Sequence, residues 1–277
     1  MKIGCWNVRG LNWPLKQNGV HNLMIKHKLD VLGILESKLS SPKLASIMKN
    51  KFSGFWEVDN FHLHAGGRIL IIWNPAKVSL ELIDMSPQVV HCKATCKVSS
   101  ISFCISFVYT YNSVVGRRPL WLSLKEFSSQ CNRPWLLLGD FNCVLKAEEK
   151  HSVVPVSDYA IKDFEESCIE LGLSDIHYSG CQFTWSNNSV MSKLDRVMAN
   201  SLWFVEGYFG HAHFIPAGSL SDHSASIVSI LHSAPVKSKS FKFFNMWASH
   251  PSFFELVENE WQFEGFGSKQ YVLCKIL

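Results

Sequence analysis

Short apolar runs recur along the chain at the length and spacing typical of β-strands. Most are rich in β-branched or aromatic side chains, which pack well on a half-buried pleated surface. They predict about ten to eleven strands, over residues 2–6, 31–35, 69–73, 78–83, 89–98, 101–109, 135–138, 183–185, 194–198, 208–214 and 224–230. Pro75 and the pair Ser99-Ser100 fall where we expect hairpin connections.

Helical spacing interrupts this series in three places. Pro14 suits the first turn of a helix, and apolar residues repeat at helical spacing after it. A second helix is indicated by the apolar repeat between Leu120 and Phe127, and a third by Ser157 as N-cap and Gly172 as terminator. Because strands outnumber helices and the two are interspersed, we predict the α/β class. The expected architecture is a four-layered α/β sandwich, with two mixed or antiparallel sheets face to face and helices outside.

The composition is that of an ordinary globular protein, with 47% hydrophobic and 18% charged residues. Lysine and arginine number 27 against 23 aspartates and glutamates, and this balance permits a nucleic-acid partner without requiring one. The apolar runs fall far short of the ~20 residues of a membrane helix, and no secretory signal is visible. We therefore expect a soluble intracellular protein without a membrane partner. Nine scattered cysteines predict free thiols in a reducing compartment.

One shift in composition predicts a domain boundary near residue 232. After Ile230 the chain enters a linker-like stretch containing Ser, Pro and Lys, followed by an aromatic segment without a complete core of its own. We assign residues 1–231 to one domain and residues 232–277 to a linker and truncated connector.

Four short motifs fall at the ends of predicted strands, where loops can gather side chains into one site. Each motif alone is weak, because acidic residues often follow strands and Gly-Asp-x-Asn is also good turn chemistry. Together, their order and strand context agree with one family. The motifs contain Asn7, Glu36, Asp140 with Asn142, and Ser221-Asp222-His223.

This set resembles the endonuclease/exonuclease/phosphatase superfamily. That superfamily includes deoxyribonuclease I, apurinic/apyrimidinic endonucleases, inositol polyphosphate phosphatases and the endonucleases of LINE retrotransposons. The resemblance spans about residues 1–231 and implies a DNase I-like fold. Further matching segments are Gly66-Gly67-Arg68-Ile69, Phe107-Val108-Tyr109, Thr184-Trp185 and Lys193-Leu194-Asp195-Arg196-Val197.

The resemblance implies phosphodiester hydrolysis, which needs an activated water and neutralisation of the phosphoryl oxygens. Oxygen ligands suit Mg²⁺, with Mn²⁺ as an alternative ion. The resemblance implies that Asp140 orients and deprotonates the water, and that Asn142 holds the water or the phosphate. His223 binds the scissile phosphate and is oriented by Asp195, while Tyr109 contacts the phosphate through its hydroxyl. The implied metal ligands are Asn7, Glu36 and Asp222, and the implied substrate-binding residues are Arg9, Thr184, Trp185 and Ser221.

Two positions depart from the family pattern. Arg9 stands where many members carry an acid, which leaves Glu36 with more of the metal coordination; this Asn-x-Arg-Gly form is familiar from plant LINE endonucleases. Tyr111 competes with Tyr109 for the tyrosine role. A structural alternative also exists for Asp195, which could simply pair with a neighbouring basic residue.

The aromatic segment decides between branches of the superfamily. Residues 240–247 and 250–254 resemble the connector that leads into the reverse transcriptase in plant LINE polyproteins. We therefore expect an endonuclease module, truncated or an independent gene, that nicks DNA in the nucleus, leaves a 3′-hydroxyl and has a reverse transcriptase domain in full-length relatives. The alternatives are an inactive retroelement relic that binds nucleic acid or nothing, an inositol polyphosphate phosphatase, and an abasic-site endonuclease.

Overall fold

The structure is a computed structural model that describes residues 1–64, 68–187, 189–232, 248 and 251–261. The chain divides into two compact units, Met1–Ser233 and Ala234–Leu277. Helix α6 (Phe253–Trp261) belongs to the second unit. All other elements named below belong to the first unit.

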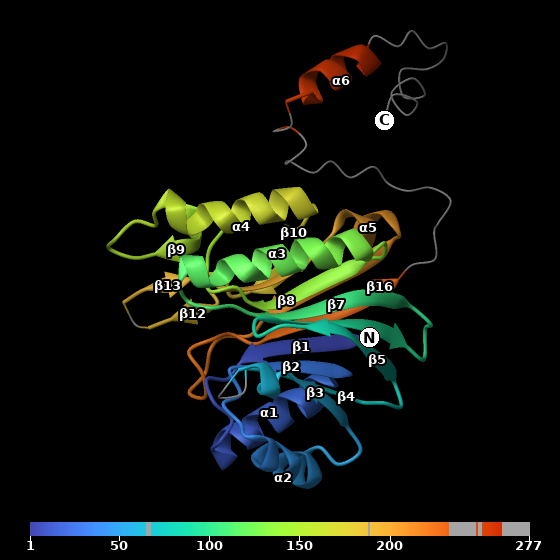
Figure 1. Ribbon diagram of the computed structural model, residues 1–277, viewed down its shortest axis with the longest axis vertical. Helices are drawn as coiled ribbons and strands as arrows, with labels where there is room; N and C mark the ends of the chain where they lie inside the picture. The colour runs from blue at the N-terminus through green and yellow to red at the C-terminus, as the bar shows by residue number, and fades with distance from the viewer. Residues whose placement is uncertain (65–67, 188, 233–247, 249–250, 262–277) are drawn as a thin grey trace. The chain divides into compact units, whose positions relative to one another are not determined.

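Two mixed sheets form the centre of the first unit (Figure 1). The seven-stranded sheet has the order β11-β15-β16-β1-β2-β4-β3, and β1 runs parallel to β2 but antiparallel to β16. Its strands are β1 (Lys2–Asn7), β2 (Val31–Leu35), β3 (Trp56–Asp59), β4 (Ile69–Trp73), β11 (His177–Gly180), β15 (Tyr208–Phe214) and β16 (Ser226–His232).

The second sheet has six strands in the order β10-β14-β8-β7-β6-β5, with β7 and β8 parallel. Its strands are β5 (Val78–Met85), β6 (Val89–Cys96), β7 (Ser102–Tyr109), β8 (Trp135–Asp140), β10 (Ser174–Asp175) and β14 (Asp195–Ala199). A small third sheet, β12-β13-β9, consists of β9 (Lys150–His151), β12 (Trp185–Ser186) and β13 (Met191–Ser192).

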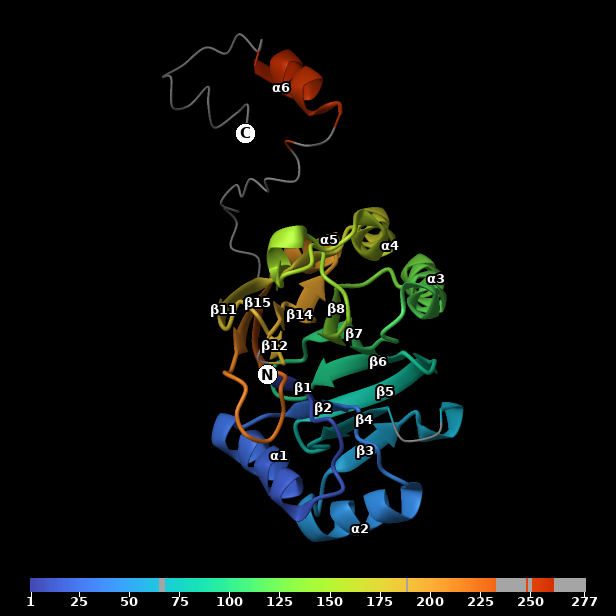
Figure 2. The ribbon, with the colours of Figure 1, turned by 90° about the vertical axis from the view of Figure 1, so that its left-hand side faces the viewer.

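Helices cover the outer faces of the two large sheets. Figures 1 and 2 show α1 and α2 beside the seven-stranded sheet, and α3 and α4 on the far side of the six-stranded sheet. The helices of this unit are α1 (Pro14–His27), α2 (Ser41–Lys51), α3 (Val114–Gln130), α4 (Asp158–Leu171) and α5 (Ser201–Val205), with 3₁₀ turns η1 (Phe61–Leu63) and η2 (Ala147–Glu149). The predicted four-layered sandwich is confirmed.

The strands read as continuous apolar runs because both faces of each large sheet are covered. On β2, for example, Val31 and Leu35 belong to the core between the sheets. Leu32 and Ile34 alternate with them and pack under α1 and α2. Because side chains alternate in this way, a single apolar strand contributes to the cores on both faces of its sheet.

Most elements lie where the sequence predicts them, including the helices that start at Pro14 and that lie between Ser157 and Gly172. The Ser99-Ser100 hairpin joins β6 to β7. The hairpin connection predicted at Pro75 is wrong, because β4 and β5 on either side of it belong to different sheets. The predicted strand at 183–185 is also largely wrong, since only a two-residue strand, Trp185–Ser186, forms there.

Two groups of predictions lie outside the described residues. Gly66 and Gly67 of the predicted glycine-led strand belong to the first group, although Ile69 does begin β4. Most of the connector-like segment, residues 240–247 and 250, belongs to the second.

Helix α2 and strand β3 carry no strong apolar pattern and the sequence did not predict them.

Substitution of Gly139 tests whether the close approach of β7 and β8 requires a residue without a side chain at this position. Its φ is +150°, and a Cβ atom there would lie 1.9 Å from the carbonyl oxygen of Val108. We expect Gly139→Ala to lower the free energy of unfolding in urea by about 3 kcal/mol. Gly218→Ala, where the space is open, should change it by less than about 0.5 kcal/mol. Equal effects of the two substitutions would contradict this explanation.

Candidate catalytic and metal site

Polar residues replace the inter-sheet core where the central strands end. Side chains two positions apart on a strand face the same way, so a polar residue two positions from a core residue enters the same gap. Within the register, Asp140 lies opposite Asp195 and beside Tyr109. The polar residues and their core neighbours are Asn7 after Cys5 on β1, Asp140 after Leu138 on β8, and Asp195 before Val197 on β14.

His223 connects the two buried carboxylates at this end of the sheets. Its Nδ1 lies 2.9 Å from Asp195 Oδ2, and its Nε2 lies 3.8 Å from Asp140 Oδ2. Asn7 Nδ2 donates a hydrogen bond of 2.9 Å to the same Asp140 oxygen. All four residues are at least 95% buried. The structure therefore brings four predicted site residues into one polar chain, Asp195–His223–Asp140–Asn7.

The loop that carries His223 is fixed by hydrogen bonds to the first strand. Ser221 Oγ donates to the Asn7 carbonyl (2.7 Å) and accepts from the His223 backbone N–H (3.1 Å). The indole of Trp6 donates to the His223 carbonyl (3.0 Å). Ser221 thus has a visible positioning role, whereas its predicted contact with substrate stays a prediction.

Thr184 holds Asp195 in a similar way. Its buried Oγ1 accepts the backbone N–H groups of Leu194 (3.0 Å) and Asp195 (2.8 Å). The neighbouring Trp185 forms an isolated bridge with His223. Thr184 therefore positions the carboxylate that pairs with the imidazole, and a direct role in substrate binding stays a prediction.

The alternative partners of Asp195 are occupied by other acids. Arg196 and Lys193 instead pair with Asp175, at 2.7 and 2.6 Å, and both also pair with Glu149. Arg196 directs its guanidinium toward the ring of Phe164 on the helical side of the sheet. Asp195 is left facing His223 in the gap between the sheets.

The Gly-Asp-x-Asn segment forms the turn that its composition also predicts. Asn142 adopts a φ of +47°, and its backbone N–H donates to Asp140 Oδ1 (2.9 Å). Its side-chain Nδ2 donates to the Thr110 carbonyl (3.1 Å). The turn and the proposed catalytic role are compatible, because the bond from the Asn142 backbone holds the buried carboxylate of Asp140 in place.

Electrostatics favour a protonated imidazole beside these carboxylates. Burial alone would lower the pKa of His223, but the charges of Asp195, Asp140 and Asp222 and the hydrogen bond that His223 donates to Asp195 raise it to about 9. Burial, with repulsion from Asp195, raises the pKa of Asp140 to about 6. Near neutral pH the site therefore holds a cationic His223 and an ionised Asp140.

Glu36 forms a second acidic position at the end of β2. It has a φ of +52°, its Oε1 lies 2.8 Å from Lys38 Nζ, and it hydrogen-bonds the hydroxyl of Tyr109. Burial would raise the pKa of Glu36, but Lys38, Tyr109 and Arg9 together lower it. Lys38 was missed in the sequence, although a cation two residues from a candidate metal ligand was visible there.

Asp222 forms a third acidic position, paired with the guanidinium of Arg9 and with Trp185 Nε1 (2.9 Å). Burial would raise its pKa, but these hydrogen bonds and the nearby His223 lower it. Asp222 Oδ1 is buried and has no hydrogen-bond partner. Arg9, predicted to bind substrate, here neutralises a predicted metal ligand.

The predicted ligands fit a magnesium ion in their chemistry. Glu36 and Asp222 are anionic, Asn7 offers a neutral oxygen, and the unpaired Asp222 Oδ1 lacks the partner that a buried oxygen needs. Asp140, Asp195 and His223 form another possible ion-binding group, with ligand atoms within 4.8 Å of one another. A protonated imidazole has no lone pair for a metal, so we favour the Glu36 group.

The two candidate tyrosines occupy different places around Arg68. The guanidinium carbon of Arg68 lies 4.2 Å from the ring centre of Tyr109 and 4.5 Å from that of Tyr111. Arg68 also donates to the Tyr109 carbonyl (2.7 Å). The hydroxyl of Tyr109 reaches Glu36, which favours Tyr109 for the predicted role. The positioning contact of Arg68 was not predicted from the sequence.

Comparison with known proteins identifies the class of this site. Residues 4–223 match the model of the Endonuclease/Exonuclease/phosphatase family, and the chain belongs to that family. The fold and family place it among the phosphodiesterases and phosphatases, a group that generally uses divalent metal ions. No helix among the described residues is long and apolar enough to cross a membrane.

Several solved structures share the fold at low sequence identity. The endonuclease domain of TRAS1, a telomere-specific non-LTR retrotransposon, matches with a TM-score of 0.63 and 11% identity over 83% of this chain and 97% of that chain. A mannosyl-6-phosphatase of Bacteroides thetaiotaomicron, Bt3783, matches with a TM-score of 0.59 and 14% identity over 83% and 99%. An AP endonuclease from Archaeoglobus fulgidus matches with a TM-score of 0.57 and 17% identity over 83% and 98%.

Titration of His223 tests the charge arrangement. An unfolded histidine has a pKa of about 6.5, whereas that of folded His223 is about 9. The stabilisation from its carboxylate partners should be complete below pH ~6.5 and lost as pH rises through ~9. NMR of the imidazole in metal-free protein measures this pKa directly, and Asp195→Asn should lower it. A His223 that titrates at or below pH 6.5 in the wild type would contradict the assignment.

Manganese binding tests the choice of metal ligands. We expect Glu36→Gln to weaken Mn²⁺ binding by about tenfold or more, because an anionic oxygen ligand is lost. Titration followed by Mn²⁺ electron paramagnetic resonance measures the affinity. Asp84→Asn, which neutralises an exposed acid on β5, is the matched control and should have no effect. Normal affinity in Glu36→Gln together with loss in Asp195→Asn would move the ion to the other group.

Proposed function

We propose that this protein is a Mg²⁺-dependent phosphodiesterase that nicks DNA and leaves a 3′-hydroxyl. The observation that carries the proposal is the buried chain Asp195–His223–Asp140–Asn7, in a member of the Endonuclease/Exonuclease/phosphatase family. It combines an anionic base with a cationic imidazole on one side of a candidate reaction centre. Hydrolysis of a phosphate ester needs both.

Each side chain of the site has a distinct role in this proposal. Asp140, with a pKa of about 6, accepts the proton of the attacking water. Cationic His223 neutralises charge on the scissile phosphate, and Asp195 keeps its ring oriented and protonated. Asn142 and the hydroxyl of Tyr109 contact the phosphate. The proposed ligands Asn7, Glu36 and Asp222 hold Mg²⁺, which polarises the phosphoryl oxygens when bound.

A cavity beside the site, with Arg9, Lys16 and Asp222 in its wall, is the proposed contact for a nucleic-acid backbone. This cavity of about 530 Å³ is lined by Arg9, Lys16 and the loop segment 217–222. Lys16 Nζ donates to the Val8 carbonyl (2.6 Å) and to the Arg9 carbonyl (3.0 Å), so it fixes the backbone beneath Arg9. Trp185 borders the same region through Asp222. Cations at fixed positions next to the reacting phosphate favour a polyanionic substrate.

A retrotransposon origin is proposed from three separate features. The Asn7-x-Arg9-Gly10 motif and the connector-like segment resemble plant LINE endonucleases. The fold is also similar to the endonuclease domain of TRAS1. A DNA substrate would place the protein in the nucleus, and a reverse transcriptase domain would accompany it in longer relatives.

Phosphatase activity is the second candidate. The fold is also similar to a mannosyl-6-phosphatase, and the proposed base, imidazole and metal ligands would serve a phosphate monoester equally well. The third candidate, an inactive relic, retains the same residues but no turnover. Activity on defined substrates distinguishes the three.

Nicking of supercoiled plasmid DNA in Mg²⁺ tests the proposal. We expect wild type to relax the plasmid, and Asp140→Asn and His223→Gln to lose about 100-fold or more of the rate, because each removes a group needed in the transition state. His211→Gln alters an exposed histidine of β15 and should retain the rate. Circular dichroism of each variant checks that it is folded.

The same preparations should be incubated with an inositol polyphosphate and with mannose 6-phosphate. Phosphate release without nicking would assign the protein to the phosphatases. Folded wild type that is inert on every substrate would favour the relic. Nicking that persists in both site variants would refute the assigned residues.

A further inference from the structure

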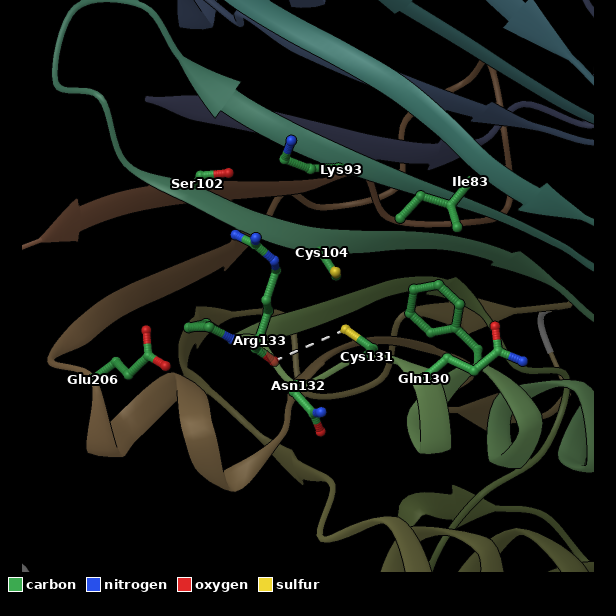
Figure 3. Close-up of a pocket in the computed structure, with 11 residues that line it drawn as sticks. Ile83, Lys93, Ser102, Cys104, Gln130, Cys131, Asn132, Arg133 and Glu206 are labelled. Atoms are coloured by element: carbon green, nitrogen blue, oxygen red, sulfur yellow. Dashed lines mark hydrogen bonds between the residues drawn. The ribbon is translucent and has the colours of Figure 1, made fainter.

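A second cavity lies away from the catalytic site and contains two cysteines. It measures about 540 Å³ and is lined at one side by Cys104 of β7 and at the other by Cys131, the residue after the last turn of α3. Figure 3 shows both sulfur atoms directed into this cavity, with Arg133 and Lys93 also on its wall. Cys104 and Tyr109 are five positions apart on β7, a distance of roughly 17 Å along a strand.

We propose that Cys104 and Cys131 form an oxidisable thiol pair, a modification site at which a peroxide produces a reversible disulfide. The two thiols are hydrogen-bonded to one another. Cys104 is buried, whereas Cys131 is partly exposed to solvent. A small oxidant can therefore reach Cys131 first, with a second thiol already beside it.

The surroundings of the pair assign different roles to the two thiols. The hydrogen bond with Cys104 lowers the pKa of the Cys131 thiol, and a backbone hydrogen bond and the charge of Arg133 add to this against the effect of burial. The same hydrogen bond, with burial, raises the pKa of Cys104. Its exposure and lowered pKa make Cys131 the thiol that reacts first, and buried Cys104 the thiol that resolves the product.

The reaction balances with one hydrogen peroxide. The Cys131 thiolate attacks a peroxide oxygen, so an S–O bond forms, the O–O bond breaks, and hydroxide leaves and takes up the proton released by Cys131. The Cys104 sulfur then attacks the sulfenic acid at Cys131, forming the S–S bond and expelling hydroxide, which takes the Cys104 proton. Two thiols are oxidised, the peroxide is reduced, and two waters are released.

The remaining cysteines of the described chain offer a matched comparison. Cys181 is also partly exposed, but it lies in the loop after β11, where its backbone N–H bonds to Phe214. It therefore reports how an exposed thiol of this protein reacts outside the cavity. The pair and the proposed phosphodiesterase site share no residue, so the proposal does not depend on that activity.

Treatment of the full chain with one equivalent of hydrogen peroxide tests the proposal. Free thiols are then blocked, and non-reducing peptide mapping follows, in which cleavage at Lys125 separates Cys104 from Cys131. We expect a peptide pair joined by Cys104–Cys131 with the loss of two hydrogens, reversed by dithiothreitol. Oxidation at this pair should be about tenfold faster than at Cys181.

Three variants make the test specific. Cys131→Ser should abolish the cross-link, and Cys181→Ser should leave it unchanged. Cys104→Ala should trap a sulfenic acid at Cys131 that dimedone labels. The proposal is overturned if Cys131 in wild type is oxidised to sulfinic acid while Cys104 stays free, if Cys181 reacts as fast, or if neither thiol of the pair reacts.

Discussion

Two aspartates buried on neighbouring strands create the electrostatic requirement around which this site is organised. Asp140 and Asp195 lie opposite one another in the register of β8 and β14, and both are almost fully buried. Two carboxylates in such a place cannot both remain ionised without a cation between them. His223 supplies that charge from a loop that Ser221 and Trp6 attach to the first strand. The imidazole thereby couples the two sheets at their common end.

The acids around the site are likewise each balanced by a nearby cation. Asp195 pairs with His223, Glu36 with Lys38, and Asp222 with Arg9. A divalent ion that binds Glu36 and Asp222 therefore has to displace these cations or share the carboxylates with them. Affinity for the metal should depend on how easily Lys38 and Arg9 move toward the substrate phosphates. Such an exchange would give Lys38 a role in substrate binding that the sequence did not indicate, beside the role predicted for Arg9.

Much of the fold was predictable because strand alternation and helix boundaries are local. The run 31–35 and the helix between Ser157 and Gly172 are examples, since burial on both strand faces and a glycine terminator leave direct signals. Helix α2 gave a weaker signal because its buried face is limited to Leu44, Ile47 and Met48. The hairpin prediction at Pro75 was wrong because a turn residue does not indicate whether the next strand joins the same sheet.

The residues of the site were predictable from the sequence, but most of the contacts between them were not. Family resemblance pointed to Asp140, Asp195 and His223, and the structure brings these residues together. The pairing of Arg9 with Asp222 joins residues 213 positions apart and depends on the path of the intervening chain. The positioning contacts of Thr184 and Ser221 likewise appear only when the loops are in place.

We propose a division of labour, in which the Asp140–His223–Asp195 group handles protons and the Glu36 group holds the metal. Anomalous diffraction from crystals grown with Mn²⁺ tests it most directly, because the ion is located without reference to activity. We expect an anomalous peak bound by Glu36 and Asp222, with His223 still hydrogen-bonded to Asp195. A peak bound by Asp140, Asp195 and His223 would contradict it.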